Sequence, residues 1–272
     1  MSETYEVVIV KYGTRETTKK DVFLNYPVYG EADEPIRMDY FFWIIRNEQR
    51  TVLVDTGFSR AGGTARKRTF LLEPARAYAA LDVDPAARPT VIVTHAHYDH
   101  IGNLGLFPDS PLILARSEYD FWTGRHAKRT QFHHSVEDEE IDALVAAHAA
   151  GNVRTFSGRL EVAPGIEVIE VGGHTPGQSV VLVDTSDGPV LLASDAIHYY
   201  EEYEQDRPFT FVADLVEMYD AFDLIRTMAG QGRVRHLVSG HDPDTLARFT
   251  PVEGELAGLA ATIGSRSGRE TQ

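Results

Sequence analysis

The stretch His95-Ala96-His97-Tyr98-Asp99-His100 places four metal-binding side chains within six residues. It follows residues 90–93, a short apolar and β-branched run that predicts a buried strand. His95 and His97 are two residues apart, so in an extended segment or a loop both can point toward one metal. Asp99 and His100 are close enough to serve a neighbouring metal. The stretch therefore predicts a metal site in the loop after this strand.

Three further candidate ligands occur at loops or strand ends. His174 lies in Gly172-Gly173-His174-Thr175-Pro176-Gly177, where the glycines allow the backbone to approach a metal closely. Asp195 ends the predicted strand 190–193, and His241 follows the predicted strand 236–238. Solvated loop histidines would not be expected to recur in this way. The sequence thus predicts one metal centre formed by seven residues: His95, His97, Asp99, His100, His174, Asp195 and His241.

Composition limits the other function classes. The 272 residues are 43% hydrophobic and 25% charged, as in ordinary globular proteins. The chain has 26 Lys and Arg against 41 Asp and Glu, a net charge of −15, which argues against a nucleic-acid partner because phosphate binding needs a cationic surface. No cysteine is present. Any metal must therefore be held by imidazole and carboxylate groups.

The chain also shows no targeting or membrane signal. Residues 1–6 lack a basic region followed by an apolar one, and no apolar run approaches the roughly 18 residues of a membrane span. We expect a cytoplasmic protein that acts on a small molecule, without a membrane partner; a homo- or hetero-oligomer stays open. We expect one domain over residues 1–264 and a polar tail over 265–272.

Apolar periodicity and breaker residues predict the main elements. The expected strands cover residues 7–10, 40–45, 51–54, 90–93, 112–115, 162–171, 179–184, 190–193 and 236–238, with 40–45 and 51–54 forming a hairpin. The expected helices cover residues 75–81, 117–122 with Ser117 as the N-cap, 139–150 and 214–228.

The ordered ligand pattern resembles that of the metallo-β-lactamase fold superfamily. That family carries His-x-His-x-Asp-His, here residues 95–100, followed by a later His, an Asp and a final His. The likeness runs from Val52 to His241 and includes the Asp55-Thr56-Gly57 turn. It implies an αββα sandwich, in which two mixed sheets lie face to face, helices cover the outside, and the metals lie at one edge.

The resemblance also implies roles for the ligands. His95, His97 and His174 would hold one metal, and Asp99, His100 and His241 the other, with Asp195 bridging both. Such ligands suit two divalent ions, Zn²⁺ first, with Fe, Mn or Co as alternatives. Two such ions can share a water and present it as hydroxide. Asp55 is expected to orient a ligand imidazole, or else to be a plain turn residue.

Within the superfamily, the chain is similar to the N-acyl homoserine lactonase-like hydrolases. Those enzymes carry a Tyr three residues after the bridging Asp, and this chain has His198 there, followed by Tyr199 and Tyr200. His198 could replace the Tyr as a donor or proton shuttle, or be an exposed loop histidine. We count Asp99, Asp195 and His198 as the catalytic candidates. If His198 is a bystander, Tyr199 or Tyr200 becomes the candidate donor.

The expected activity is the opening of a lactone or a similar activated ester. The same site could attack a thioester, an aryl ester or an electron-poor aryl ether. A glutathione thioesterase is less favoured, because no basic cluster lies near the end of the chain. A redox role of the flavodiiron kind would need Glu at the position of His97 and a further flavin domain. His126, His133 and His134 are left out of the site, and the sequence does not decide which aromatic residues line the pocket.

Overall fold

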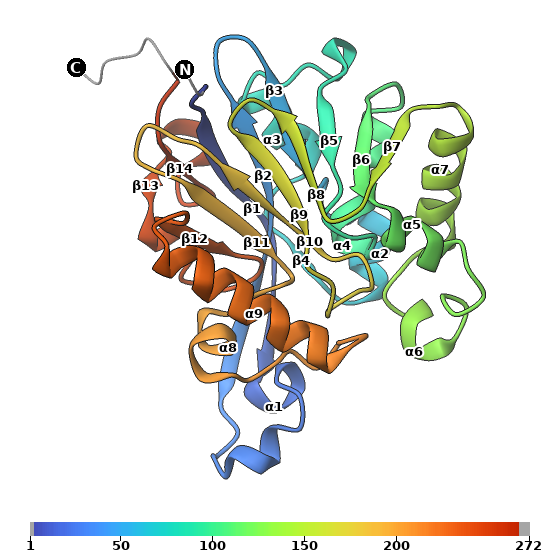
Figure 1. Cartoon of the computed structure of the whole chain (residues 1–272), viewed down its shortest axis with the longest axis vertical. Coiled ribbons are helices and arrows are strands. Elements are labelled where there is room, and N and C mark those ends of the chain that lie inside the picture. The colour runs from blue at the N-terminus through green and yellow to red at the C-terminus, as the bar shows by residue number, and fades with distance from the viewer. Residues whose placement is uncertain (1–2, 267–272) are drawn as a thin grey trace.

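The computed structural model describes residues 3–266 and has two sheets packed face to face with helices on their outer faces (Figure 1). This is the αββα arrangement that the family resemblance implies. Both chain ends approach the same part of the molecule, because β14 (Ala260–Ile263) pairs with β1 (Glu6–Thr18). The expected polar tail lies outside the described residues from residue 267 on. None of the described helices is long and apolar enough to cross a membrane.

The larger sheet is mixed. Its antiparallel half is built on the long hairpin of β1 and β2, and its other half is parallel. The order is β13-β14-β1-β2-β3-β5-β6-β7, with β4 paired to β1. The remaining strands are β2 (Pro35–Arg46), β3 (Thr51–Val54), β4 (Thr69–Phe70), β5 (Thr90–Ile92), β6 (Leu112–Ala115), β7 (Val153–Phe156) and β13 (Thr250–Pro251).

The smaller sheet has the order β12-β11-β10-β9-β8, and only β11 and β12 are parallel. Its strands are β8 (Arg159–Ala163), β9 (Ile166–Glu170), β10 (Ser179–Val183), β11 (Val190–Ser194) and β12 (His236–Ser239). The helices are α1 (Lys19–Val22), α2 (Arg60–Ala65), α3 (Pro74–Ala80), α4 (Tyr98–Ile101), α5 (Arg116–Trp122), α6 (Thr130–His133), α7 (Asp138–Ala149), α8 (Tyr200–Gln205) and α9 (Leu215–Gly230). Short 3₁₀ turns cover Tyr26–Tyr29, Pro85–Ala87, Leu104–Leu106, Leu246–Arg248 and Gly254–Leu256.

Most predicted elements are present, but β1 extends to Thr18 and β2 begins at Pro35, well beyond the predicted ranges 7–10 and 40–45, and three further details are wrong. Residues 162–171 are not one strand, because Gly165 takes a left-handed conformation with φ of 84° and turns the chain between β8 and β9. Ser117 does not cap α5; the N-cap is Ala115, and the Ser117 hydroxyl donates to Glu170 instead. The metal-binding stretch is not all loop, because Tyr98–Ile101 forms one helical turn.

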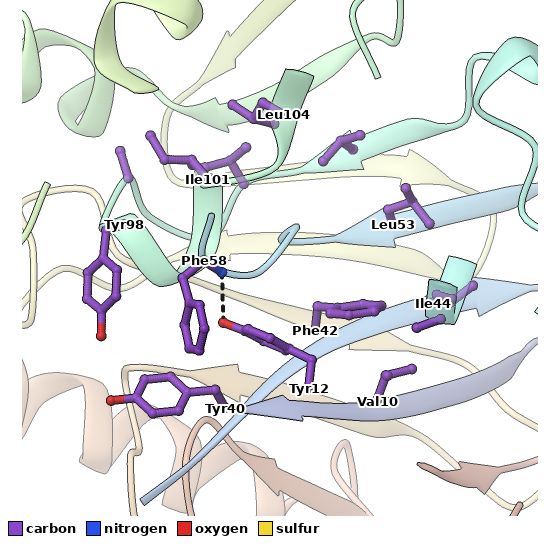
Figure 2. Close-up of a cluster of buried hydrophobic side chains, with 14 of the residues drawn as sticks. Val10, Tyr12, Tyr40, Phe42, Ile44, Leu53, Phe58, Tyr98, Ile101 and Leu104 are labelled. Atoms are coloured by element: carbon purple, nitrogen blue, oxygen red, sulfur yellow. Dashed lines mark hydrogen bonds between the residues drawn. The ribbon is translucent and has the colours of Figure 1, made fainter. Parts of the chain in front are cut away.

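Apolar side chains fill the space between the sheets and the space under the outer helices. Trp43 of β2 is fully buried between the sheets, next to strands from both. An aromatic cluster lies on the opposite face of the larger sheet, and Figure 2 shows Tyr12 and Phe58 at its centre. The Tyr12 hydroxyl accepts from the Phe58 N–H at 3.0 Å and donates to the Asp99 carbonyl at 3.0 Å. The cluster thus fixes the metal-binding stretch to the sheet.

The buried carboxyl of Glu140 on α7 predicts a pH-dependent stability. Burial raises its pKa from 4.5 to about 7, and the Ser59 hydroxyl donates to it at 2.9 Å. Because the pKa is higher in the folded state, the contribution of this carboxyl is fully present below pH 4.5 and is lost as pH rises through about 7. We therefore expect Glu140→Gln to gain stability relative to wild type between these two pH values. Urea unfolding of both proteins at a series of pH values measures the difference in their free energies of unfolding. A difference that does not vary with pH would contradict the prediction.

Candidate metal centre

The seven predicted ligands come together at one edge of the two sheets. The strands β5, β11 and β12 end beside one another in the two sheets, and the chain after each carries ligands into the gap. The backbone is strained there: Ser194, directly before Asp195, has φ of 46°, and Asp55 has φ of 60°. Non-glycine residues rarely take such angles, and they cluster at functional sites. Every one of the seven side chains is buried.

The first group contains His95, His97 and His174, each of which offers a ring nitrogen within 4.8 Å of the others. His174 Nε2 lies 3.0 Å from His97 Nδ1. The backbone before His174 needs glycine, since a Cβ on Gly173, with φ of 87°, would lie 2.6 Å from the Met218 Cα of α9. The two glycines let this loop pack directly against α9.

The second group contains Asp99, His100 and His241, again within 4.8 Å of one another. His100 Nε2 lies 3.9 Å from Asp99 Oδ1, and His241 Nε2 lies 3.9 Å from Asp99 Oδ2. The two imidazoles come from segments far apart in the chain, and both are almost fully buried. These three side chains therefore form a second cluster of potential ligands beside the first.

Asp195 lies between the two groups and faces both. Its Oδ2 is 3.8 Å from His95 Nε2 and 3.4 Å from His174 Nε2. Its Oδ1 is 3.3 Å from His100 Nε2 and 3.1 Å from His241 Nε2. A carboxylate with one oxygen toward each group has the arrangement that a bridging ligand requires.

Outer contacts aim the imidazoles inward. His100 Nδ1 lies 2.7 Å from Asp55 Oδ2, so the contact expected for Asp55 is present. The Phe211 carbonyl lies 2.7 Å from His174 Nδ1, and the Asp39 carbonyl lies 2.8 Å from His241 Nδ1. Because one ring nitrogen is held in each case, the other is left for the centre.

The donor set fits divalent cations. Buried polar atoms normally have partners, yet His95 Nε2, His100 Nε2 and Asp195 Oδ1 have none and all face the centre. Burial, together with the neighbouring imidazoles, lowers the pKa of His95 and His97 well below the usual value and that of His174 to about 3. Neutral imidazole is the form that binds a metal. Protein groups alone leave these atoms unsatisfied, and a pair of cations would satisfy them.

Glu118 of α5 connects the two main ligand loops, and sequence reasoning missed it. Its Oε1 accepts from the Ala96 N–H at 2.8 Å and from Trp122 Nε1 at 2.7 Å. Its Oε2 accepts from the Thr175 hydroxyl at 2.7 Å and the Gly177 N–H at 2.9 Å. Only the fold brings these donors to one fully buried carboxylate. Glu118 therefore sets the spacing between His97 and His174.

His198 is fully buried, so the interpretation of an exposed loop histidine is wrong. Its Nε2 lies 3.1 Å from Asp195 Oδ2, and its Nδ1 lies 3.1 Å from Glu202 Oε2. Burial alone would lower its pKa, but the Asp195 and Glu202 carboxylates raise the pKa to about 9. Phe209 stacks on the ring with centroids 3.8 Å apart.

A cavity of about 300 Å³ opens onto the ligands His97, Asp99, His174 and Asp195. Its apolar wall contains Tyr40, Tyr98, Phe209 and Phe211, a choice of aromatic residues that the sequence did not decide. His134, which the sequence analysis left out of the site, also lines the cavity, whereas His133 pairs with Asp138. These positions carry no local signal, because register and loop packing select them.

The fold and the paired His and Asp groups define a metal-dependent hydrolase. The chain belongs to the metallo-beta-lactamase superfamily, whose sequence pattern matches residues 39–236. A curated relative, the N-acyl homoserine lactonase of Bacillus sp, is 26% identical over 191 residues, which is 65% of this chain and 71% of the relative.

Two solved structures share the fold. One is a quorum-quenching N-acyl homoserine lactone lactonase with a TM-score of 0.75 and 21% identity, covering 90% of this chain and 95% of that one. Another is AidC, a dizinc quorum-quenching lactonase, with a TM-score of 0.71 and 18% identity over 99% of this chain and 97% of that one.

Replacing Glu118 tests its role in setting the ligand spacing. In Glu118→Gln an NH₂ group replaces an acceptor oxygen and faces buried N–H donors, so the loops that carry His97 and His174 should shift. We expect metal affinity to fall about 10- to 100-fold, as for other residues that orient ligands. Competition with a chelator measures this, with Glu255→Gln at an exposed surface pair as the control. Unchanged metal affinity in a folded variant would refute the assignment.

Proposed function

We propose that this protein is a dinuclear metal hydrolase that opens a lactone or a similar activated ester. The position of Asp195, with one oxygen toward each group of ligands, carries the proposal. His95, His97 and His174 would hold one ion, and Asp99, His100 and His241 the other. The lactonase names of the relatives support a lactone as the substrate class.

Bound divalent cations would lower the pKa of a shared water toward neutrality and polarise the substrate carbonyl. The protein supplies the rest. The ligand loops would hold the ions at the residues that line the cavity, and the apolar wall would limit water around the substrate. The ligand set consists of imidazole and carboxylate, so we propose Zn²⁺, with Fe, Mn or Co as alternatives.

His198 is better placed to act on Asp195 than on the substrate. Phe209 separates its ring from the cavity, while its Nε2 points to Asp195 Oδ2. Glu202 fixes the ring from the other side and also accepts from the His198 N–H at 2.6 Å. We infer that His198 is a positioning residue that holds the bridging carboxylate. Neither Tyr199 nor Tyr200 lines the cavity, so neither replaces it as a donor.

The remaining assignments concern domain, partner and location. We propose that residues 1–264 act as one hydrolase domain, because β14 closes onto β1 in the larger sheet. The net charge of −15 supports a small-molecule substrate over nucleic acid. The absence of cysteine fits a reducing cytoplasm, which we propose as the location.

Metal analysis tests the dinuclear proposal. The purified protein should hold close to two metal ions per chain, and His97→Ala should lose metal from the first group together with activity, by orders of magnitude. Elemental analysis and hydrolysis of a chromogenic lactone give the two readouts. His133→Ala, a substitution on an exposed histidine, is the control. Full activity in a protein that retains no metal would refute the proposal.

His198 can be tested by substitutions that separate its contact with Asp195 from its bulk. His198→Ala should lower kcat about 10- to 100-fold with little change in KM, because the carboxylate loses the imidazole that lies 3.1 Å from its Oδ2 and orients it. His198→Gln keeps an N–H at similar reach and should recover part of kcat. His198→Tyr introduces the tyrosine that the lactonases carry at this position. If His198→Ala retains the wild-type kcat, the residue plays no part.

A further inference from the structure

The cavity above the metal centre contains two arginines that form no close ion pair with a described carboxylate. Arg15 on β1 and Arg68 before β4 both line it. Within residues 3–266, neither forms an ion pair with Asp or Glu, whereas Arg66 beside them pairs with Glu137. In a chain with 41 acidic residues against 26 basic ones, two adjacent unpaired guanidinium groups need an explanation.

Strand pairing places the two charges side by side. The antiparallel register of β1 and β4 matches Gly13 with Phe70 and Thr14 with Thr69. Arg15 directly follows these paired residues on β1 and Arg68 directly precedes them on β4, and both line the cavity, so the two side chains lie close together. Like charges held close together are destabilising. An anion between the two guanidinium groups would remove this repulsion.

Both side chains have donors to spare. The Arg15 side chain makes no hydrogen bond to any described residue, and its Nε is buried without a partner. Arg68 donates from Nε to the Tyr98 hydroxyl at 2.9 Å and from Nη1 to the Arg66 carbonyl at 2.8 Å, which leaves Nη2 unused by the described chain. A buried guanidinium nitrogen without a partner is costly unless a ligand supplies one.

Neighbouring groups hold Arg68 in this position. Its guanidinium lies over the Tyr40 ring, 5.7 Å from the centroid, and Figure 2 shows the Tyr40 and Tyr98 hydroxyls directed away from the aromatic cluster. Burial raises the pKa of Tyr40 to about 12, and both Arg15 and Arg68 act against this rise, so both charges lie near the same ring. The cationic patch is therefore held in place before any substrate binds.

We propose that Arg15 and Arg68 bind a carboxylate group of the substrate, so that the natural substrate is a compact anionic lactone or ester. This rests on the proposed hydrolase function. Guanidinium groups match a carboxylate with paired hydrogen bonds. The cavity volume of about 300 Å³ is at the small end for ligand sites and has aromatic walls, which favours a small planar molecule. An N-acyl homoserine lactone has no charge to offer these arginines.

Matched substrates test the proposal in the metal-loaded enzyme. Carboxyphthalide, its neutral carboxamide and N-hexanoyl homoserine lactone share a hydrolysable lactone, and only the first is anionic. We expect kcat/KM for the carboxylate to exceed that for the carboxamide by about 10-fold or more. Arg15→Gln and Arg68→Gln should raise KM for the carboxylate about 10- to 100-fold and change KM for the carboxamide much less. Arg68→Lys should recover part of the loss.

The controls separate this proposal from the hydrolase proposal. Arg76→Gln, at an exposed pair with Glu255, should behave as wild type on all three substrates. Equal turnover of carboxylate and carboxamide, unaffected by the two Gln variants, would overturn the carboxylate subsite and leave the hydrolase proposal intact.

If no lactone is hydrolysed, the hydrolase proposal fails, and calorimetric titration with benzoate and benzamide then tests the carboxylate subsite alone. Benzoate binding that weakens in Arg15→Gln supports the subsite, and binding that is equal in all variants overturns it. Arg15→Gln carries the test if Arg68→Gln does not fold, because the Arg15 side chain makes no hydrogen bond to the described chain.

Discussion

The carboxylate of Asp195 is the contact on which the site depends, because it is the one group that faces both sets of imidazoles. Five histidine nitrogens lie within 3.8 Å of its oxygens. The carboxylate reaches this position only because β11 ends at Ser194 with a strained backbone. The neighbouring strands must end at positions that bring their own ligands to this carboxylate. The register of both sheets therefore determines the geometry of the metal centre.

A buried polar network maintains this arrangement. Glu118 connects the loop after β5 with the loop after β9, Asp55 holds His100, and Glu202 holds His198. Each of these carboxylates is removed from water, so its hydrogen bonds act in a medium of low dielectric constant and are costly to leave unmade. Acidic residues thus serve here as rigid supports for imidazoles rather than as surface charges.

Local charge in the cavity differs from the charge of the whole chain. The net charge of −15 repels anions at long range, but salt screens this repulsion over about 8–10 Å. At contact distance, two unpaired guanidinium groups and the expected metal cations favour an anion. The positions of charges within the cavity therefore influence which substrate binds more than the net charge of the chain does.

The sequence by itself determined the metal-ligand candidates and most of the strands. Residue type and spacing specify ligand chemistry directly, and apolar runs such as those of β3 and β6 mark buried strands wherever they occur. The family resemblance added the arrangement of the two sheets. The local pattern also predicted one strand over residues 162–171, and this was wrong because the apolar run continues across a turn at Gly165.

Tertiary structure alone decided the surroundings of the centre. Glu118, Arg15 and Arg68 lie in segments with no recognisable motif, and each acquires its role from partners far away in the chain. Arg15 and Arg68 are neighbours only because β4 pairs with β1 in one register. A shift of one residue would place such side chains on the opposite face of the sheet. Strand register and loop packing arise from long-range contacts, so no short stretch of sequence encodes them.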